Sequence, residues 1–453
     1  MKGLRKSLLI GMTLGVTMLG TVGCMNQDSA SSNDVLKVGA ISFAGTLEPT
    51  ENYFSWAVVR FGIGETLIKF DDQMKATPWL ATSWKQGDDK LTWTFTINDK
   101  VKFSNGNKLT AEAVKASLER TFAKSKRAKT FFNYTEITAN GQELTIKTDK
   151  EYYNLPNLLG DPLFLIMDVT AEANGRDIAK EGPVGTGPYV VSSFTKERAE
   201  LKRNDNYWDG EPKLDKIVVE TISDGDTLTM ALQSGELDAA YGLPYASHSL
   251  FTEDKDYTIS SCETSRSFFA QMNYATESLK DANVRKAIAC AINKEEFTRV
   301  LLNGNGTAAK GPFPVGYAYG DSRVSTEEYN VAKAKELLAA SGWIDTDGDG
   351  YVEKDGKRLT LSWLTYPSRQ ELPLLAENVQ AALKDIGIEI KINCTANHLD
   401  YIKKGDWDIY ASAFVCAPTG DAEYFFTTHC LKDSSKNRGG YYNEKLEELE
   451  KTM

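Results

Sequence analysis

The chain has 453 residues, more than one compact core usually holds, so we expect two or three lobes. Apolar residues make up 41% and aromatic residues 10%, which is enough for buried cores. The 25% of charged residues excludes a protein that crosses a membrane many times. The net charge of −11 argues against nucleic acid as a partner, because binding to nucleic acid depends on basic patches.

The first residues are typical of an export signal. A basic start precedes an apolar run from Leu8 to Val22, and we expect residues 1–23 to be removed as a signal peptide. The stretch Thr21-Val22-Gly23-Cys24 resembles a bacterial lipobox, so Cys24 is the predicted lipidation site and 24–33 a flexible tether. The alternative is a plain secretory signal with a chance cysteine. Either signal predicts that the protein is located outside the cytoplasm. Lipidation predicts that it is anchored to the cell membrane, which would place it in the periplasm of a cell with two membranes.

The elements that follow mix strands with helices. Alternating or β-branched stretches predict strands at 35–41, 91–97, 144–148, 189–194, 216–222 and 359–364. Amphipathic patterns predict helices at 110–122, 283–292, 294–302, 331–340 and 444–451. Thr110 is the expected N-cap of the first of these helices. The mixture indicates α/β lobes and not a sandwich or a helical bundle.

An acidic stretch, Asp345-Thr-Asp-Gly-Asp-Gly350, resembles the start of a calcium loop. Position twelve of such a loop would be Gly356, where a bidentate Glu is required. We therefore interpret the stretch as a tight turn before the strand at 359–364.

Several short phrases, taken in order, resemble the family of extracellular solute-binding proteins that serves oligopeptide, dipeptide and nickel importers. They are Pro-Trp-Leu-Ala-Thr-Ser-Trp (78–84), Leu-Thr-Trp-Thr-Phe (91–95), Val-Lys-Phe-Ser-Asn-Gly (101–106), Gly-Thr-Gly-Pro-Tyr (185–189), Asn-Asp-Asn-Tyr-Trp (204–208), Gly-Glu-Leu-Asp (235–238), Asn-Val-Arg-Lys-Ala-Ile (283–288) and Gly-Gly-Tyr-Tyr-Asn (439–443). Most of these phrases have structural explanations. In the Gly-Thr-Gly-Pro turn, for example, we expect the glycines to adopt backbone conformations closed to other residues.

The resemblance implies an α/β, bilobed periplasmic-binding-protein fold of type II, similar to cluster C, with an extra domain inserted in the first lobe. By the family pattern, lobe I is discontinuous and comprises 34–56 and 183–262. Residues 57–182 form the appended domain, and lobe II comprises 263–453. The family continues past this point with a return segment into lobe I, so we expect the C-terminus to be truncated.

The loop Ala413-Phe-Val-Cys-Ala-Pro-Thr-Gly-Asp421 bears on the ligand. Peptide-binding members usually place an Asp early in this loop to pair with the peptide amine, and Pro418 stands there instead. The sequence of this loop resembles the corresponding loop of the nickel and metallophore-chelate branch. The stretch Arg60-Phe-Gly-Ile-Gly-Glu-Thr-Leu67 resembles the same branch. The resemblance thus implies a nickel or other transition-metal chelate, with an oligopeptide or dipeptide as the alternative. Arg60 and Asp421 are candidate ligand-binding residues.

Arg127 lies where nickel-type members carry an arginine that binds ligand carboxylates. A guanidinium fork suits such recognition, although the end of a solvated basic helix is an equal interpretation. The family pattern also implies a strand at 158–167 with a second arginine after it. That arginine is missing, because the matching stretch is Asp161-Pro-Leu-Phe-Leu165.

Three histidines are present and none are paired as HxH or HxxxH, so a site for a bare metal ion is not expected. His429 is the candidate metal ligand because it follows the 413–421 loop closely. Trp56 and Tyr366 are the aromatic residues that we expect to line the cleft, although core packing is the commoner fate of such rings.

The predicted partners are a small-molecule ligand and the permease subunits of an ABC importer, with no nucleic acid and no cofactor, and the protein is expected to be a monomer. No GxSxG or HExxH motif is present, so we predict a binding protein and not an enzyme. A secreted hydrolase remains the remote alternative, since paired carboxylates are easily found among 63 acidic residues.

Overall fold

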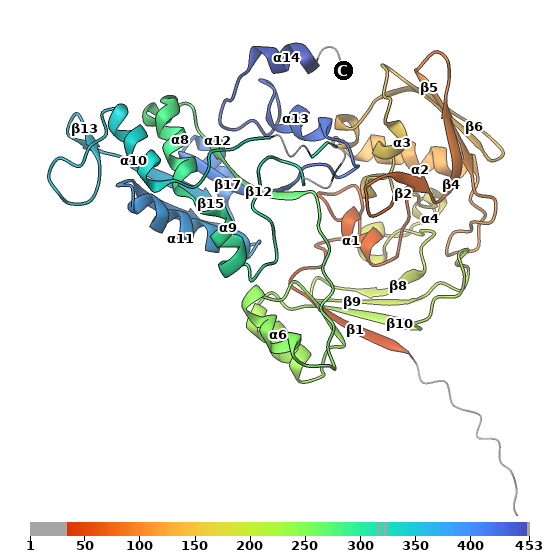
Figure 1. Cartoon of the computed structure of the whole chain (residues 1–453). Coiled ribbons are helices and arrows are strands. Elements are labelled where there is room, and N and C mark those ends of the chain that lie inside the picture. The colour runs from red at the N-terminus through yellow and green to blue at the C-terminus, as the bar shows by residue number, and fades with distance from the viewer. Residues whose placement is uncertain (1–33, 315–316, 318, 321–323, 451–453) are drawn as a thin grey trace, which may run out of the picture.

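The computed structural model describes residues 34–314, 317, 319–320 and 324–450. The predicted signal peptide, Cys24 and the tether lie outside these residues. Figure 1 shows two bodies side by side, which we name the first body (residues 34–252) and the second body (residues 266–450). Within the described residues, no helix combines the length and apolar character needed to cross a membrane.

The first body contains a mixed five-stranded sheet. Its strand order is β11 (Ala239–Tyr241), β1 (Val35–Ala40), β10 (Lys216–Thr221), β9 (Arg198–Arg203) and β8 (Tyr189–Phe194). β1 runs parallel to both of its neighbours, and the other pairs are antiparallel. Residues 35–40 are therefore held between two strands, β10 and β11, that come from much later in the sequence. Helix α6 (Gly225–Gln233) lies between β10 and β11 in the chain, and the short η3 (Tyr245–Ser247) and α7 (Ser249–Thr252) follow β11.

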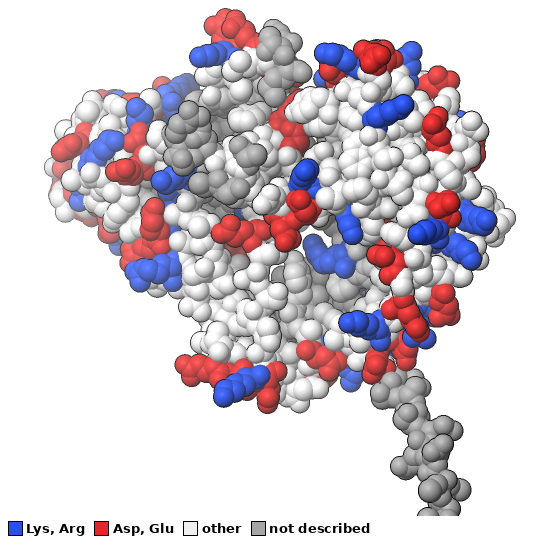
Figure 2. Space-filling view, turned by 45° about the vertical axis from the view of Figure 1, so that its right-hand side comes forward, with Lys and Arg blue, Asp and Glu red and all other residues white. Residues whose placement is uncertain are grey.

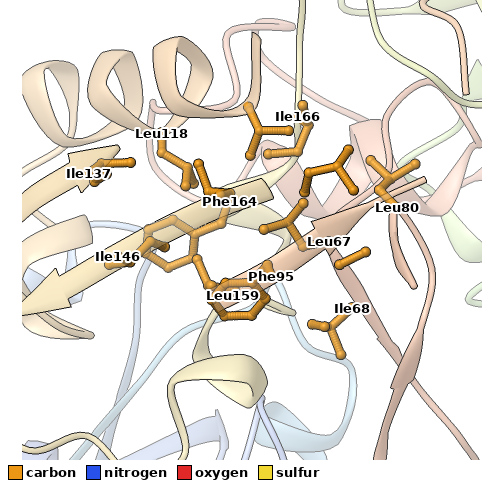
Figure 3. Close-up of a cluster of buried hydrophobic side chains, with 14 of the residues drawn as sticks. Leu67, Ile68, Leu80, Phe95, Leu118, Ile137, Ile146, Leu159, Phe164 and Ile166 are labelled. Atoms are coloured by element: carbon orange, nitrogen blue, oxygen red, sulfur yellow. The ribbon is translucent and has the colours of Figure 1, made fainter. Parts of the chain in front are cut away.

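A second sheet of the first body is antiparallel, with the order β4 (Ala81–Gln86), β5 (Thr92–Ile97), β7 (Glu143–Thr148) and β6 (Tyr134–Asn140). In β5 the alternation of the sequence buries Trp93, Phe95 and Ile97 on one face. Helix α2 (Ala111–Lys124) covers that face with Leu118, and Figure 3 shows the packed cluster. Burying each such side chain contributes about 1.5–3 kcal/mol.

Short elements connect these parts. They are α1 (Ser55–Arg60), the hairpin β2 (Ile68–Phe70) and β3 (Ala76–Pro78), η1 (Ala128–Thr130), α3 (Leu155–Leu158), η2 (Pro162–Phe164), α4 (Val169–Ala173) and α5 (Ile178–Glu181). The predicted strand at 158–167 was wrong, because Pro162 begins a 3-10 turn and the carboxylate of Asp161 accepts a hydrogen bond from the Leu163 N–H at 2.8 Å. Only Ile166 forms a bridge, with Glu65.

The second body has a four-stranded sheet with the order β12 (Arg266–Met272), β17 (Ile409–Val415), β15 (Thr360–Thr365) and β16 (Glu389–Cys394). Its other elements are η4 (Glu277–Lys280), α8 (Ala282–Ala291), α9 (Lys294–Glu296), η5 (Phe297–Leu301), α10 (Val331–Ala340), β13 (Glu353–Lys354), β14 (Lys357–Arg358), α11 (Glu371–Lys384), α12 (His398–Lys404), α13 (Glu423–His429) and α14 (Glu444–Glu450). The predicted helix at 294–302 forms as one α-turn followed by a π-helical turn, η5. Mixed α/β architecture, as predicted, describes both bodies.

Two of the family-like phrases meet at one buried carboxylate, that of Glu65 in the stretch 60–67. Glu65 is 1% exposed, and it accepts hydrogen bonds from Thr186 Oγ1 at 2.7 Å, Trp208 Nε1 at 2.9 Å and Tyr207 OH at 3.1 Å. The donors come from 185–189 and 204–208, so these phrases hold the first body together. Burial raises the pKa of Glu65 against the lowering effect of the three donors.

The glycines of the Gly-Thr-Gly-Pro turn serve a purpose other than the predicted one. Neither Gly185 nor Gly187 has a positive φ. A Cβ at Gly185 would lie 2.2 Å from the carbonyl oxygen of Ile63, and one at Gly187 would lie 2.2 Å from that of Gly62. The turn therefore requires glycine because two backbones approach closely.

A buried ion-pair network ties α2 to the segment before α1. The guanidinium of Arg120 donates to the Glu48 carboxylate at 2.6 and 3.0 Å and also to Glu172, and both Arg120 and Glu48 side chains are 8% exposed. We expect Arg120→Met to lower the free energy of unfolding by about 3 kcal/mol, because the buried Glu48 would lose the guanidinium that donates to it and keep only the more distant Lys124, at 3.9 Å. Urea unfolding followed by tryptophan fluorescence measures this loss.

The acid dependence of the same network has a definite sign. Hydrogen bonds from Arg120, and secondarily from Lys124, lower the pKa of Glu172 from 4.5 to about 2. Its stabilising contribution is thus present above pH 4.5 and lost as the pH falls toward 2. The difference between wild type and Arg120→Met should shrink over that range. Arg198→Met, in an exposed ion-pair group, is the control and should cost less than about 1 kcal/mol; an equal cost in the two variants would contradict the prediction.

Candidate ligand site between the two bodies

Arg127 lies in the first body where α2 has ended and η1 begins. Its guanidinium carbon is 4.6 Å from the centroid of the Tyr53 ring, and its Nη1 is 3.7 Å from Asp161 Oδ1. The Nε and Nη2 atoms are shielded from solvent and have no hydrogen-bond partner among the described residues. Since buried donors are normally paired, the guanidinium retains unused capacity for a ligand.

Asp161 supports this arginine only in part. Its side chain is 1% exposed, and burial raises the pKa of its carboxyl while the charge of Arg127 lowers it. The position that lacks the second arginine of the family thus holds a buried carboxyl group beside Arg127. One carboxylate at 3.7 Å does not saturate a guanidinium fork.

The loop after β17 reaches across to the first body. Asn157 Nδ2 donates to the carbonyl oxygen of Thr419 at 2.9 Å, and Asn154 Nδ2 donates to the carboxylate of Asp421. Gly420 has φ +70°, and a Cβ there would lie 2.4 Å from the Met74 carbonyl oxygen. The two bodies are therefore in contact at this loop.

Asp421 itself is engaged in this contact. Besides Asn154, its carboxylate accepts from the Glu423 N–H at 2.9 Å. Burial raises the pKa of Asp421. These bonds use the carboxylate for holding the loop against the first body, which leaves less of it for a ligand.

His429, at the end of α13, is enclosed by aromatic rings. Its ring centroid is 4.2 Å from that of Phe414, 5.1 Å from Phe425 and 5.4 Å from Phe269, and the residue is 7% exposed. Nδ1 lies 2.8 Å from Thr428 Oγ1. Burial lowers the pKa of the imidazole to about 3, so the ring is neutral at neutral pH.

Tyr366 and Arg60 belong to a second group of residues. The Tyr366 ring stacks on His398 at 4.4 Å, and its hydroxyl accepts from the Ala413 N–H at 3.2 Å. Arg60 is exposed and lies 5.1 Å from the ring of Tyr241. Burial lowers the pKa of Arg266, and the charge of Arg369 lowers it further. Tyr241 and Tyr366 act on Arg266 in the opposite direction.

Trp56 is half-buried on α1, and Figure 1 shows this helix on the side of the first body that faces the second. Tyr53, 53% exposed, is the aromatic residue of this segment that contacts Arg127. Trp407 packs in a small core with Leu364 and Tyr410. The structure thus gathers Arg127, Tyr53 and the residues around His429 on one side, and Arg60 and Tyr366 on the other.

Two residues of the site were missed in the sequence analysis, Tyr424 and Lys436. Tyr424, on α13, packs against the core of the first body, and its ring stacks on Phe131 at 5.8 Å. Lys436 Nζ lies 3.9 Å from the centroid of Phe414. Neither residue belongs to a family-like phrase, although Lys436 stands just before the phrase at 439–443. Figure 2 shows a hollow between the bodies with Lys and Arg side chains beside it.

The acidic stretch at 345–350 lies elsewhere, beside β13 at the outer end of the second body (Figure 1). The carboxylate of Asp345 accepts from Gly348 N–H at 2.7 Å and Gly350 N–H at 3.0 Å, as in the predicted turn. Oxygen atoms of Asp345, Asp347, Asp349 and Glu353 lie within 4.8 Å of one another on a mostly exposed surface. Arg358 pairs with Asp349 there.

Comparison with known proteins identifies the family. The sequence profile described as "Bacterial extracellular solute-binding proteins, family 5 Middle" matches residues 75–437. The chain belongs to this family. The predicted family and the predicted class, a solute-binding protein, are therefore confirmed, and the protein acts outside the cytoplasm.

The relatives match both ligand classes that the sequence suggested. Nickel-binding protein NikA of Staphylococcus aureus is 32% identical over 436 residues, which cover 96% of this chain and 84% of that protein. A crystal structure of this NikA in complex with Ni(L-His)2 superposes with a TM-score of 0.78 at 30% identity, covering 92% of this chain and 86% of the other. Oligopeptide-binding protein AppA of Bacillus subtilis is 28% identical over 417 residues, or 86% of this chain and 76% of AppA. The superposition confirms the bilobed fold.

Proposed function

We propose that this protein captures a chelate of a transition metal, nickel held by histidine or a similar chelator, between its two bodies. The proposal rests chiefly on the guanidinium of Arg127, whose Nε and Nη2 atoms are buried and have no hydrogen-bond partner in the described part of the chain. A guanidinium fork binds a carboxylate with two parallel hydrogen bonds. The Ni(L-His)2 complex of the S. aureus relative supports a chelator that carries carboxylates.

A bare metal ion fits this site poorly. Lys436 and Arg438 act electrostatically on His429, and the charge of Arg127 in turn reaches Lys436. This excess of positive charge repels a bare divalent cation, whereas the carboxylates of a chelator compensate for it. We keep His429 as the candidate metal ligand, since its neutral ring is the form that binds metal. Its enclosure means that the chelator supplies most of the ligands.

The peptide alternative has less support in the site. AppA is an oligopeptide-binding relative, and a peptide amine would need a free carboxylate at the 413–421 loop. Pro418 provides none, and Asp421 is engaged by Asn154. We therefore favour the chelate, and we propose binding and not catalysis.

The remaining parts of the proposal concern assembly. We propose that the ligand stabilises the closed state by binding it more tightly than the open state, and that the closed form docks on the permease of an ABC importer as a monomer. We propose anchoring through a lipid on Cys24. We also keep the division into 34–56 with 183–262, 57–182 and 263–453. The strands of the five-stranded sheet come from both segments assigned to lobe I, which supports it.

Calorimetric titration of the metal-free protein tests the function. We expect nickel with L-histidine in twofold excess to bind with a micromolar or lower Kd, while nickel alone and a pool of di- to pentapeptides give no heat of binding. The physical reason is that only the chelate brings a carboxylate to Arg127.

L-histidine without metal is the control and should bind at least about tenfold more weakly, since it lacks the second chelator and the metal. Tight binding of metal-free peptides, with no response to the nickel chelate, would replace the chelate by a peptide as the ligand.

A further inference from the structure

Among the described residues of the second body, no carboxylate forms an ion pair with Lys436. This lysine follows α13, and its Nζ lies over Phe414, 3.9 Å from the ring centroid. Burial lowers its pKa to about 8, and the charges of Arg438 and Arg127 act in the same direction. Among the described residues, Cys416 is the one group whose effect on this lysine opposes them, and it is not a carboxylate.

A column of three rings connects this lysine with Arg127 of the first body. Phe414 and Tyr424 are parallel within 7° at 5.6 Å, and Tyr424 is stacked on Phe131 at 5.8 Å and 21°. The guanidinium of Arg127 is 5.8 Å from the Phe131 ring. The column crosses from the second body to the first between Tyr424 and Phe131, so Lys436 and Arg127 stand at its two ends.

Closure therefore carries an electrostatic cost when no ligand is present. Moving the bodies together brings Lys436 toward Arg127, and like charges in a poorly hydrated space repel. Asp161 compensates only Arg127, and incompletely, because its distance is 3.7 Å and burial raises its pKa. The three rings occupy the line between the two cations, so an anion that lies beside the ring column and reaches both ends would turn this repulsion into attraction on both sides.

We infer that Arg127 and Lys436 form a two-sided anion clamp, which closes on a chelate that carries carboxylates on two sides and holds the bodies apart when such a ligand is absent. This inference rests on the proposed capture of a chelate, and it adds a specificity residue and a reason for ligand-dependent closure. The matching substrate class is a metal bound by two amino-acid-type chelators. A chelate with one carboxylate satisfies only one end of the clamp.

The first test compares affinities of the full chain for nickel with L-histidine. Lys436→Met, which keeps an apolar stem over Phe414, and Lys436→Gln should both weaken binding about tenfold, and Lys436→Arg should stay within about threefold of wild type. Nickel with histamine, which lacks the carboxylate, should bind weakly to every variant, and its affinity should not differ among the Lys436 variants. Lys432→Gln is the matched control because Lys432 is an exposed lysine near the same helix; it should equal wild type.

The second test needs no ligand. Small-angle X-ray scattering of the metal-free variants should show a smaller radius of gyration for Lys436→Met and Lys436→Gln than for wild type, because the repulsion that favours the open form is gone. High salt should compact the wild type and change the two neutral variants less.

The outcomes separate this inference from the proposed function. If Lys436→Met and Lys436→Gln bind nickel–histidine as wild type does, the clamp is wrong while chelate capture stands. If wild type binds no nickel–histidine, the proposed function fails, and the clamp is then decided by the ligand-free scattering alone. An unchanged radius of gyration in both neutral variants overturns the clamp in either case.

Discussion

Replacing Arg127 by Met should weaken the binding of nickel with L-histidine about 100-fold, close to 3 kcal/mol. The expected loss is large because the Nε and Nη2 atoms are shielded from solvent, so their bonds to a ligand carboxylate do not compete with water. Arg127→Lys keeps the charge but loses the planar fork, and it should cost about tenfold. Isothermal titration calorimetry gives both values.

A loss of stability has to be separated from this loss of affinity. Removing Arg127 leaves Asp161 buried without its cation, and an unpaired buried carboxylate is destabilising. The double variant Arg127→Met with Asp161→Asn removes both charges, and Asn can still cap η2. We expect it to regain stability but to bind as weakly as Arg127→Met.

The partly exposed Arg203 supplies the control, since its partners Asp205, Glu211 and Asp215 lie at the surface. Arg203→Met should leave the affinity unchanged. Binding of the nickel chelate by Arg127→Met with the wild-type Kd would show that Arg127 is a structural arginine only.

Local patterns predicted much of the fold because the information is contained in neighbouring residues. The strand at 189–194 and the helix at 331–340 form with the predicted bounds, and Thr110 caps α2 through a bond from the Ala113 N–H at 3.3 Å. The stretch at 158–167 has no alternation, and such an apolar run does not distinguish a buried strand from buried turns. There Pro162 and the Asp161 cap decide the outcome.

The site was less predictable for a different reason. Arg127 was identified through resemblance to a family, but its neighbours Tyr53 and Asp161 come from distant parts of the chain. Tyr424 and Lys436 belong to the second body and come near it across the contact between the two bodies. The close approach at Gly185 likewise depends on where a different segment lies. No periodicity or short motif records such contacts, since they depend on how whole domains pack.

Closure itself should be sensitive to a single methyl group at Gly420. Its Cβ position lies 2.4 Å from the Met74 carbonyl oxygen of the first body, which is far inside van der Waals contact. Gly420→Ala should therefore favour the open form and raise the Kd for nickel–histidine about tenfold, because the apparent affinity falls with the fraction of the closed form. Stopped-flow measurement should show a faster dissociation rate, since the closed complex is the form that is strained.

The positive φ of Gly420, +70°, also strains an alanine independently of closure, by about 1 kcal/mol. Gly405 provides a matched control, because it has the same φ of +70° with nothing within 4 Å of its Cβ position. Gly405→Ala should thus lose similar stability in thermal unfolding and keep the wild-type affinity. Equal effects of the two variants on the Kd would mean that backbone strain and not contact between the bodies limits binding. A selective effect of Gly420→Ala would establish that ligand affinity depends on the fit of the 413–421 loop against the first body.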